Sequence, residues 1–162
     1  MSYSQIADVF TLVHRKGKFR LSSKNILFRT SFIQRLPLSS THYQHYLPFF
    51  PLAIGSFAFH DYDLVISSSH CVAKGLRVPD NVCYVAYIHT PMRYIWDQFD
   101  AYFGNGRAGW FTRTAMRLLR RPLQRWDVSS NDGVYRFVAN SEHVARRIRS
   151  YWGEKQPFSI HR

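Results

Sequence analysis

Three short apolar runs in the chain each pass directly into polar residues. The runs cover residues 63–66, 83–88 and 136–139, and they are followed by Ser67–His70, His89–Pro91 and Asn140–Ser141. Buried strands of a parallel sheet are nearly continuous apolar runs, and ligands bind beyond the carboxyl ends of such strands. The pattern therefore predicts three parallel strands whose carboxyl ends bring polar residues to one edge of a sheet.

Helical periodicity occurs between and after these runs. Residues 142–151 keep apolar positions at helical spacing, with Ser141 suited to cap the first turn and Gly153 following the last. Residues 110–126 form a second candidate helix, in which Pro122 predicts a kink. Strands alternating with helices predict an α/β fold, a Rossmann-like parallel sheet with flanking helices.

The N-terminal part of the chain has weaker patterns. Residues 7–14 and 26–32 are β-rich apolar segments and predict two more short strands. Residues 42–59 place aromatic and aliphatic residues at helical spacing, but Pro48 and Pro51 must kink or divide that helix.

Length and composition indicate one domain with a packed core. The chain has 162 residues, of which 46% are hydrophobic and 17% aromatic. It has no apolar run of about 18 residues or more, and its first residues lack the pattern of a secretory signal, so a cytoplasmic location is expected. Cys71 and Cys83 stand singly, which argues against a zinc site or a disulfide framework and favours buried apolar roles.

The net charge of +12 comes from 22 Lys and Arg against 10 Asp and Glu, and it suits an anionic partner. Nucleic acid, a phosphorylated substrate and an anionic membrane all meet that description. Arginines gather in residues 110–126, which allow two interpretations. The helix presents either a solvated or interdomain face, or a surface for anionic lipid with Trp110, Phe111 and Trp126 at the headgroup level.

Two residues after the second run are candidates for chemistry. His89 could donate to a substrate hydroxyl, a phosphate or a developing charge, or it could merely satisfy a loop carbonyl. Thr90 precedes a proline and is pushed to extended geometry, which would aim His89 and Arg93 into the crevice. Arg93 could clamp a phosphate or carboxylate, or it could form a salt bridge with Asp97.

The other two strand ends give weaker signals. Ser67–His70 could offer hydroxyls and amides to a polar ligand, although helix capping explains a serine run equally well. Asn140 and Ser141 are favoured as capping residues and kept as lining residues. The sequence contains no HExxH, GxGxxG or Walker motif, no paired metal-binding His or Cys and no Ser/His/Asp spacing, so no metal is predicted.

Residues 62–75, 87–97 and 136–148 together resemble, in order and spacing, the N-terminal domain of bacterial glycosyltransferases of family 4. The resemblance is to the group 1 type, related to mannosyltransferases of polysaccharide biosynthesis. Residues 10–13 and 29–37 also resemble early segments of that family, so the likeness covers about residues 7–153.

The resemblance implies a GT-B fold, in which two Rossmann-like domains face each other across a cleft. The first domain holds the acceptor, and the second holds a nucleotide-sugar donor. It implies transfer of a hexose such as mannose to a glycan or lipid-linked acceptor, with retention of configuration and without a metal. By the same resemblance His89, and His89 alone, lines the cleft near the transferred sugar. We treat Arg93, Ser69 and Asn140 as its expected acceptor-side neighbours.

The sequence also departs from the family pattern. Family members begin with another strand and a Gly-rich turn before the strand at residues 7–13, and they continue past residues 151–153 into a donor-binding domain. We therefore expect residues 1–162 to be a single partial domain with the C-terminal donor domain absent, as from a truncated reading frame. The absent strand is central in a Rossmann-like sheet, so a gap with unpaired backbone groups and marginal stability is expected.

Two functions follow from these observations. The first is the acceptor-binding half of a glycosyltransferase, inactive alone, cytoplasmic or peripheral at the inner face of the membrane through residues 110–126, with no nucleic acid as partner. The alternative is a basic, non-enzymatic module that binds anionic membrane or nucleic acid through residues 110–126 and the basic loop at residues 15–24.

Overall fold

The computed structural model describes residues 7–14, 26–104, 106, 109–153 and 158–160, so the basic loop at residues 15–24 lies outside the described residues. Two compact units make up the chain, residues 1–57 and residues 58–162, and each has its own parallel sheet.

The first unit contains a two-stranded parallel sheet. Strand β1 (Val9–Thr11) pairs with β2 (Phe28–Thr30), so the two predicted strands are confirmed but are shorter than expected. The pairing is supported by a salt bridge of 3.1 Å from Arg29 to Asp8. The ring of Phe10 also packs edge-on against Phe57, with 5.2 Å between the ring centroids.

Short helical segments complete the first unit. They are the 3-10 helix η1 (Phe32–Arg35), α1 (Ser39–His42), the 3-10 helix η2 (Tyr43–Phe49) and α2 (Phe50–Gly55). Pro48 lies inside η2, and Pro51 lies in the first turn of α2, where its missing N–H costs no helical hydrogen bond. The prolines therefore divide the predicted helix into pieces, as their positions suggested.

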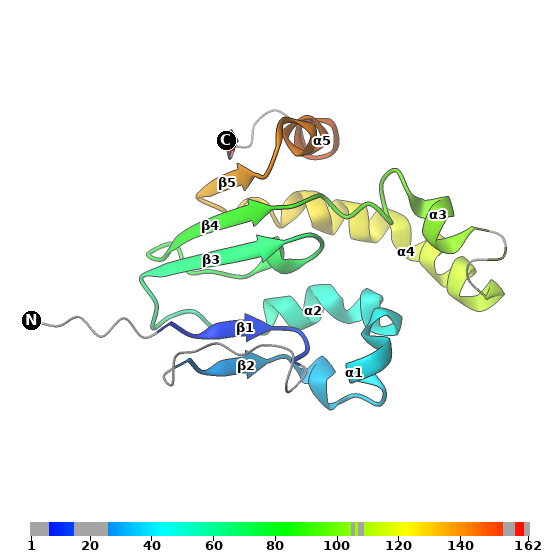
Figure 1. The fold of residues 1–162 in the computed structure, drawn as a ribbon, viewed down its shortest axis with the longest axis horizontal. Helices are drawn as coiled ribbons and strands as arrows, with labels where there is room; N and C mark the ends of the chain where they lie inside the picture. Colours follow the sequence, from blue (N-terminus) through cyan, green and yellow to red (C-terminus); the bar gives the residue numbers. More distant parts are fainter. Residues whose placement is uncertain (1–6, 15–25, 105, 107–108, 154–157, 161–162) are drawn as a thin grey trace, which may run out of the picture. The chain divides into compact units, whose positions relative to one another are not determined.

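The second unit contains a four-stranded sheet in which all neighbouring strands are parallel. Its strands are β3 (Leu64–Ser69), β4 (Cys83–Ile88), β5 (Arg136–Ala139) and β6 (Phe158–Ile160), in that spatial order. Figure 1 shows β3, β4 and β5 side by side. The three predicted strands are confirmed. Strand β6 was not predicted, because three residues are too few to give a periodic signal.

The described residues of the second unit also form four helical segments. They are η3 (Ala73–Gly75), α3 (Phe99–Phe103), α4 (Trp110–Ser129) and α5 (Glu142–Trp152). The Ser141 hydroxyl caps α5 by accepting from the Val144 amide, and the helix ends at Gly153 with φ of 89°. Helix α4 continues past Pro122 to Ser129, three residues beyond the predicted end. The α/β class, a Rossmann-like parallel sheet with flanking helices, is thus confirmed.

The two faces of this sheet differ. Alternate residues on one face form the core with the apolar sides of α4 and α5; among them are Val65, Tyr84, Ala86, Ile88, Phe137 and Ala139. On the opposite face Leu64, Ile66 and Ser68 of β3 are exposed. Cys83, at the start of β4, is exposed on that face too, so the expectation of a buried role is wrong for this cysteine.

Strand β3 is an edge strand among the described residues. The carbonyls of Asp63 and Ser69 accept from the amides of Cys83 and His89, so the odd-numbered residues of β3 bond to β4. The backbone polar groups of Leu64, Ile66 and Ser68 consequently face the open edge. The expected gap in a single sheet and the expected marginal stability both remain predictions.

Gly75 provides a test of the packing behind the sheet. It is buried, and a Cβ at this position would overlap the ring of Trp126. Because overpacking forces rigid neighbours to move, Gly75→Ala should lower the free energy of unfolding by about 1–3 kcal/mol in urea denaturation. Gly133→Ala is the matched control, since its Cβ meets open space. Equal stability of the two variants would contradict this packing.

Candidate functional site

The carboxyl ends of β3, β4 and β5 meet at one edge of the sheet. The strand register aligns Ser69 with Ile88 and Ile88 with Ala139. The backbone ladder extends one residue further, because the His89 amide donates to the Ser69 carbonyl and the Asn140 amide to the Ile88 carbonyl. The structure therefore brings Ser69, His89 and Asn140 together, as the sequence predicted.

His89 is exposed at this edge, beside the exposed Ser68 of the neighbouring strand. Its Nε2 atom lies 2.9 Å from the Ser68 hydroxyl of the neighbouring strand, within hydrogen-bond distance. The imidazole also packs edge-on against the Tyr87 ring, with 5.0 Å between the centroids. The ring therefore contacts a serine hydroxyl instead of a loop carbonyl, and this contact orients an imidazole that solvent can reach.

Ser69 has a different role from its neighbour Ser68. Its side chain is buried, and its hydroxyl accepts from the Lys74 amide at 3.3 Å and lies 3.4 Å from the Cys71 carbonyl. These contacts shape the turn after β3. The hydroxyl that faces solvent at this edge belongs to Ser68.

The Arg93 side chain is exposed, and the described residues include no ion pair for it. The alternative of a salt bridge to Asp97 is wrong, because Asp97 pairs with Arg147 at 2.7 Å. Arg93 contributes its main chain to the turn, where its carbonyl accepts from the amides of Trp96 and Gln98. Its guanidinium remains available for an anionic group.

Asn140 and Ser141 start helix α5. The Ser141 hydroxyl donates to the Asn140 side-chain oxygen at 3.0 Å and accepts from the Val144 amide at 3.3 Å. Capping therefore explains Ser141, as favoured from the sequence. Asn140 is partly exposed beside the end of β4 and is a lining residue at most.

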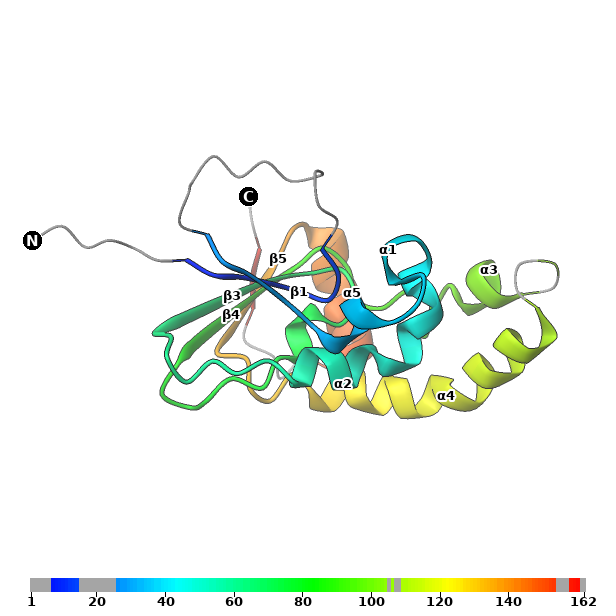
Figure 2. The ribbon, with the colours of Figure 1, turned by 90° about the horizontal axis from the view of Figure 1, so that it is seen from below.

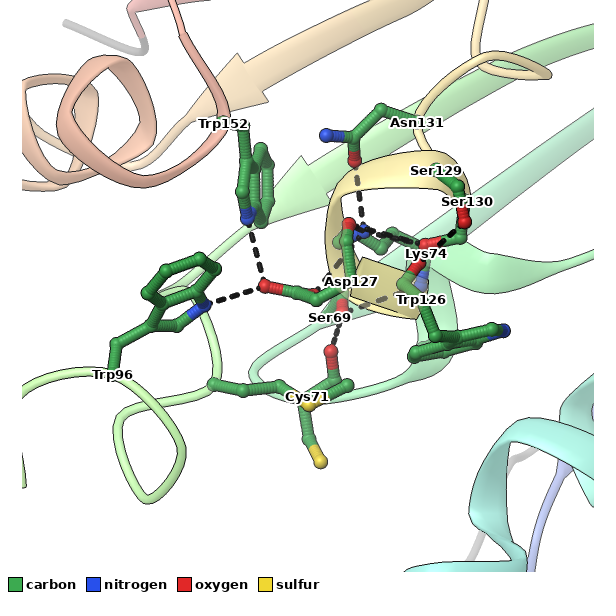
Figure 3. A network of polar contacts seen from close by, with 12 residues as sticks. Ser69, Cys71, Lys74, Trp96, Trp126, Asp127, Ser129, Ser130, Asn131 and Trp152 are labelled. Atoms are coloured by element: carbon green, nitrogen blue, oxygen red, sulfur yellow. Dashed lines mark hydrogen bonds and ion pairs between the residues drawn. The ribbon is translucent and has the colours of Figure 1, made fainter. Parts of the chain in front are cut away.

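Behind this edge lies a buried ion pair that sequence reasoning missed. Lys74 of η3 is 1% exposed and Asp127 of α4 is 0% exposed, with 3.3 Å between the Lys74 ammonium and Asp127 Oδ1. The same ammonium donates to the Asp127 carbonyl, the Ser130 hydroxyl and Asn131 Oδ1 (Figure 3). Every donor position of the ammonium is therefore used inside the protein.

Two indole rings complete the surroundings of this pair. Asp127 Oδ2 accepts from Trp96 Nε1 at 2.7 Å and from Trp152 Nε1 at 2.8 Å (Figure 3). The Lys74 ammonium lies 4.5 Å from the centroid of the Trp152 ring, a cation–π distance. Burial lowers the pKa of Lys74, and the neighbouring Asp127 carboxylate opposes that shift.

The ion pair positions the candidate site without touching it. Trp96 closes the segment that starts at His89, and Asp127 fixes Trp96 to α4 and, through Trp152, to α5. The Lys74 carbonyl also accepts from the Tyr84 hydroxyl at 2.8 Å, which attaches η3 to β4. The sequence contained one signal for the buried ion pair. Asp127 is the sole acidic residue in α4, and it shares the apolar side of the helix with Leu123.

Cys71 follows β3 and contacts the segment that comes after β4. Its sulfur is 2.9 Å from the Tyr94 hydroxyl, which also donates to the Met92 sulfur at 3.3 Å. Burial raises the pKa of the Cys71 thiol from its ordinary 9.0 to about 12, so the sulfur is no nucleophile at neutral pH.

The described residues contain no group of three or more His, Cys, Asp or Glu that could hold a metal ion. None of the helices in the described part of the chain is long and apolar enough to cross a membrane. Comparison of the chain with protein-family models, with curated proteins and with solved structures found no match.

Removing one partner of the buried pair should destabilise the second unit strongly. Lys74→Met leaves the Asp127 carboxylate without its counter-charge, so we expect a loss of about 3–5 kcal/mol in the free energy of unfolding measured in urea. Asp97→Asn, which removes the more exposed pair with Arg147, should cost about 0–1 kcal/mol. Similar losses for the two variants would show that the Lys74–Asp127 pair does not hold the structure together.

The two cysteines should differ in reactivity. At a pH below 9.0, iodoacetamide should modify the exposed Cys83 first and Cys71 only after unfolding in urea, as followed by mass spectrometry. A Cys83→Ser variant isolates Cys71, and rapid labelling of that variant when folded would contradict the assignment.

The raised pKa of Cys71 also predicts a pH dependence of stability. The unfolded chain loses the Cys71 proton first as the pH rises above 9.0, so the free energy of unfolding should fall between that pH and about 12.

Proposed function

We propose that the chain carries the acceptor-binding side of a retaining, metal-independent glycosyltransferase. In this role it binds a glycan or lipid-linked acceptor at the carboxyl ends of β3, β4 and β5. A nucleotide hexose, such as a mannose donor, is supplied by a second domain. The resemblance of residues 62–75, 87–97 and 136–148 to family 4 glycosyltransferases motivates the proposal, and the parallel sheet is compatible with it.

One observation supports the proposal most directly. The His89 imidazole is exposed at the end of a parallel strand and is oriented by the Ser68 hydroxyl at 2.9 Å. An imidazole in that place can donate to, or accept from, a sugar hydroxyl. The nearby sequence contributes an exposed arginine, Arg93, whose guanidinium suits a phosphate such as that of a lipid-linked acceptor.

The role of each residue follows from its surroundings. His89 contacts the sugar at the reacting end, Arg93 binds an anionic group of the acceptor, and Asn140 lines the edge. Ser69 acts indirectly by shaping the turn after β3. Because the sheet edge offers hydrogen-bonding groups, the chain's own contribution is binding and orientation of the acceptor.

Acceptor binding is the property to test, since the proposal assigns the nucleotide sugar to another domain. The full chain should bind some members of an array of mannose-, glucose- and galactose-containing oligosaccharides, with and without a phosphorylated reducing end. His89→Ala should weaken that binding by about tenfold, which corresponds to one hydrogen bond to the ligand. Arg93→Gln should weaken only the phosphorylated members.

Arg146→Gln, at an exposed position on α5, is the matched control and should leave binding unchanged. Circular dichroism of each variant distinguishes loss of binding from loss of fold. Binding that His89→Ala leaves intact, or the absence of binding to every saccharide on the array, would overturn the proposal.

A further inference from the structure

Helix α4 carries two adjacent stripes on its outer side. The apolar stripe consists of Phe111, Ala115, Leu118 and Pro122, at successive spacings of four, three and four residues. The basic stripe consists of Arg117, Arg121 and Arg125, each four residues after the previous one. Such spacings place the members of a stripe on one side of a helix.

Exposure confirms that both stripes face outwards. Phe111 is 81% exposed, Leu118 is 74% exposed, and Trp110 at the start of the helix is 63% exposed. Arg117, Arg121 and Arg125 are exposed as well. Large apolar side chains beside arginines, all open to solvent, are unusual on a helix whose other side already packs on a core.

The inner side of α4 is fixed in place, so the outer side cannot turn inwards. Met116 and Leu123 are buried, and Arg120 donates to the carbonyls of Ile95 and Trp96 at 2.8 and 2.7 Å. Asp127, the sole acidic residue of the helix, is also buried. The outer side of α4 therefore carries arginine charges without any acidic residue of its own to neutralise them.

A hollow lies beside the basic stripe, between α3 and α4. Its volume is about 520 Å³, and it is lined by Phe99, Asp100, Leu118 and the arginines at 117, 120 and 121. Arginine guanidinium groups bind phosphate through paired hydrogen bonds. The apolar stripe and this hollow share Leu118, so a partner on the stripe would bring its phosphates to the arginines. Figure 2 shows this end of α4, with α3, extending away from the strands of the same unit.

We propose that the outer side of α4 docks on a membrane that contains anionic phospholipids. Phe111 and Leu118 enter the acyl boundary, Trp110 lies at the headgroup level, and the basic stripe binds lipid phosphates. Nucleic acid fits less well, because stacking on bases requires aromatic platforms and the stripe beyond Phe111 is aliphatic. A second copy fits less well too, because two basic stripes repel each other. The proposal does not depend on glycosyl transfer.

Vesicle binding tests the proposal on the full chain. The chain should co-sediment with vesicles of phosphatidylcholine mixed with phosphatidylglycerol and should bind weakly to vesicles of phosphatidylcholine alone. Added salt should weaken the binding, since screening reduces the attraction of the arginines. Tryptophan emission should shift to shorter wavelength on the anionic vesicles, and Trp110→Phe should reduce that shift.

Two sets of substitutions assign the binding to α4. Replacing Arg117, Arg121 and Arg125 with Gln should weaken binding on the order of 100-fold, at about fivefold for each charge. Phe111→Gln with Leu118→Gln should weaken it by at least about tenfold. Glutamine keeps a helix propensity close to that of arginine, so the helix should persist, and circular dichroism checks this.

The matched control replaces three exposed arginines outside α4, Arg77, Arg136 and Arg146, with Gln. An equal loss in this control would attribute binding to the net charge and overturn the proposal. Equal binding to both kinds of vesicle would also overturn the proposal. Displacement of the chain from vesicles by an oligonucleotide that binds more tightly through the same arginines would overturn it as well. Self-association that is lost with Phe111→Gln and Leu118→Gln would instead assign the surface to a second copy.

Discussion

The second unit depends on one buried ion pair, between Lys74 and Asp127. Neither charge reaches solvent, so the attraction between the two groups and the hydrogen bonds around them must offset the cost of taking both charges out of water. The ammonium donates to a backbone carbonyl, a hydroxyl and an amide oxygen, and Oδ2 of the carboxylate accepts from two indole N–H groups. The other carboxylate oxygen, Oδ1, makes no hydrogen bond within the described residues and faces the ammonium at 3.3 Å. Elements far apart in the sequence therefore share one set of contacts around the two charges.

This pair also explains why the candidate site has a defined shape although its residues are exposed. The segment from His89 to Trp96 has little regular structure of its own. It is fixed at its start by the backbone ladder with β3, and at its end by the Trp96 indole on Asp127 and the Trp96 carbonyl on Arg120. A ligand at the strand ends would thus meet side chains that are already positioned, which reduces the entropy lost on binding.

The elements that the sequence predicted well are those with a strong local signal. Strands β3, β4 and β5 appear as apolar runs, and α5 has both its cap and its terminal glycine in the sequence. The grouping of Ser69, His89 and Asn140 followed from the parallel sheet alone. Strand β6 could not be predicted, because its three residues are defined by pairing with β5 and not by their own pattern.

Within the site, the sequence could place residues on the edge but could not say which way they face. Ser68 and Ser69 are adjacent and chemically identical, yet one is exposed beside His89 and the other is buried under the turn, because successive residues of a strand point to opposite faces. The alternative of a salt bridge from Arg93 to Asp97 rests on helical spacing, but the chain forms a turn there and Asp97 pairs with Arg147 instead. For the contact of Lys74 with Asp127, 53 residues away, the sequence marks only one partner, because Asp127 lies on the apolar side of a helix and nothing in the pattern points to Lys74.

The two sides of α4 link the proposed membrane surface to the candidate site. The outer side of the helix carries the apolar and basic stripes. On its inner side, Arg120 donates to the carbonyls of Ile95 and Trp96, and Gln124 also donates to the Ile95 carbonyl. Arg93, four residues after His89, belongs to the turn that the hydrogen bonds from Arg120 and Gln124 fix. A membrane bound to α4 would consequently lie at a constant orientation to His89 and Arg93. Such an arrangement suits an acceptor that is itself anchored in lipid, because its polar end needs to reach the sheet edge while its lipid stays in the bilayer.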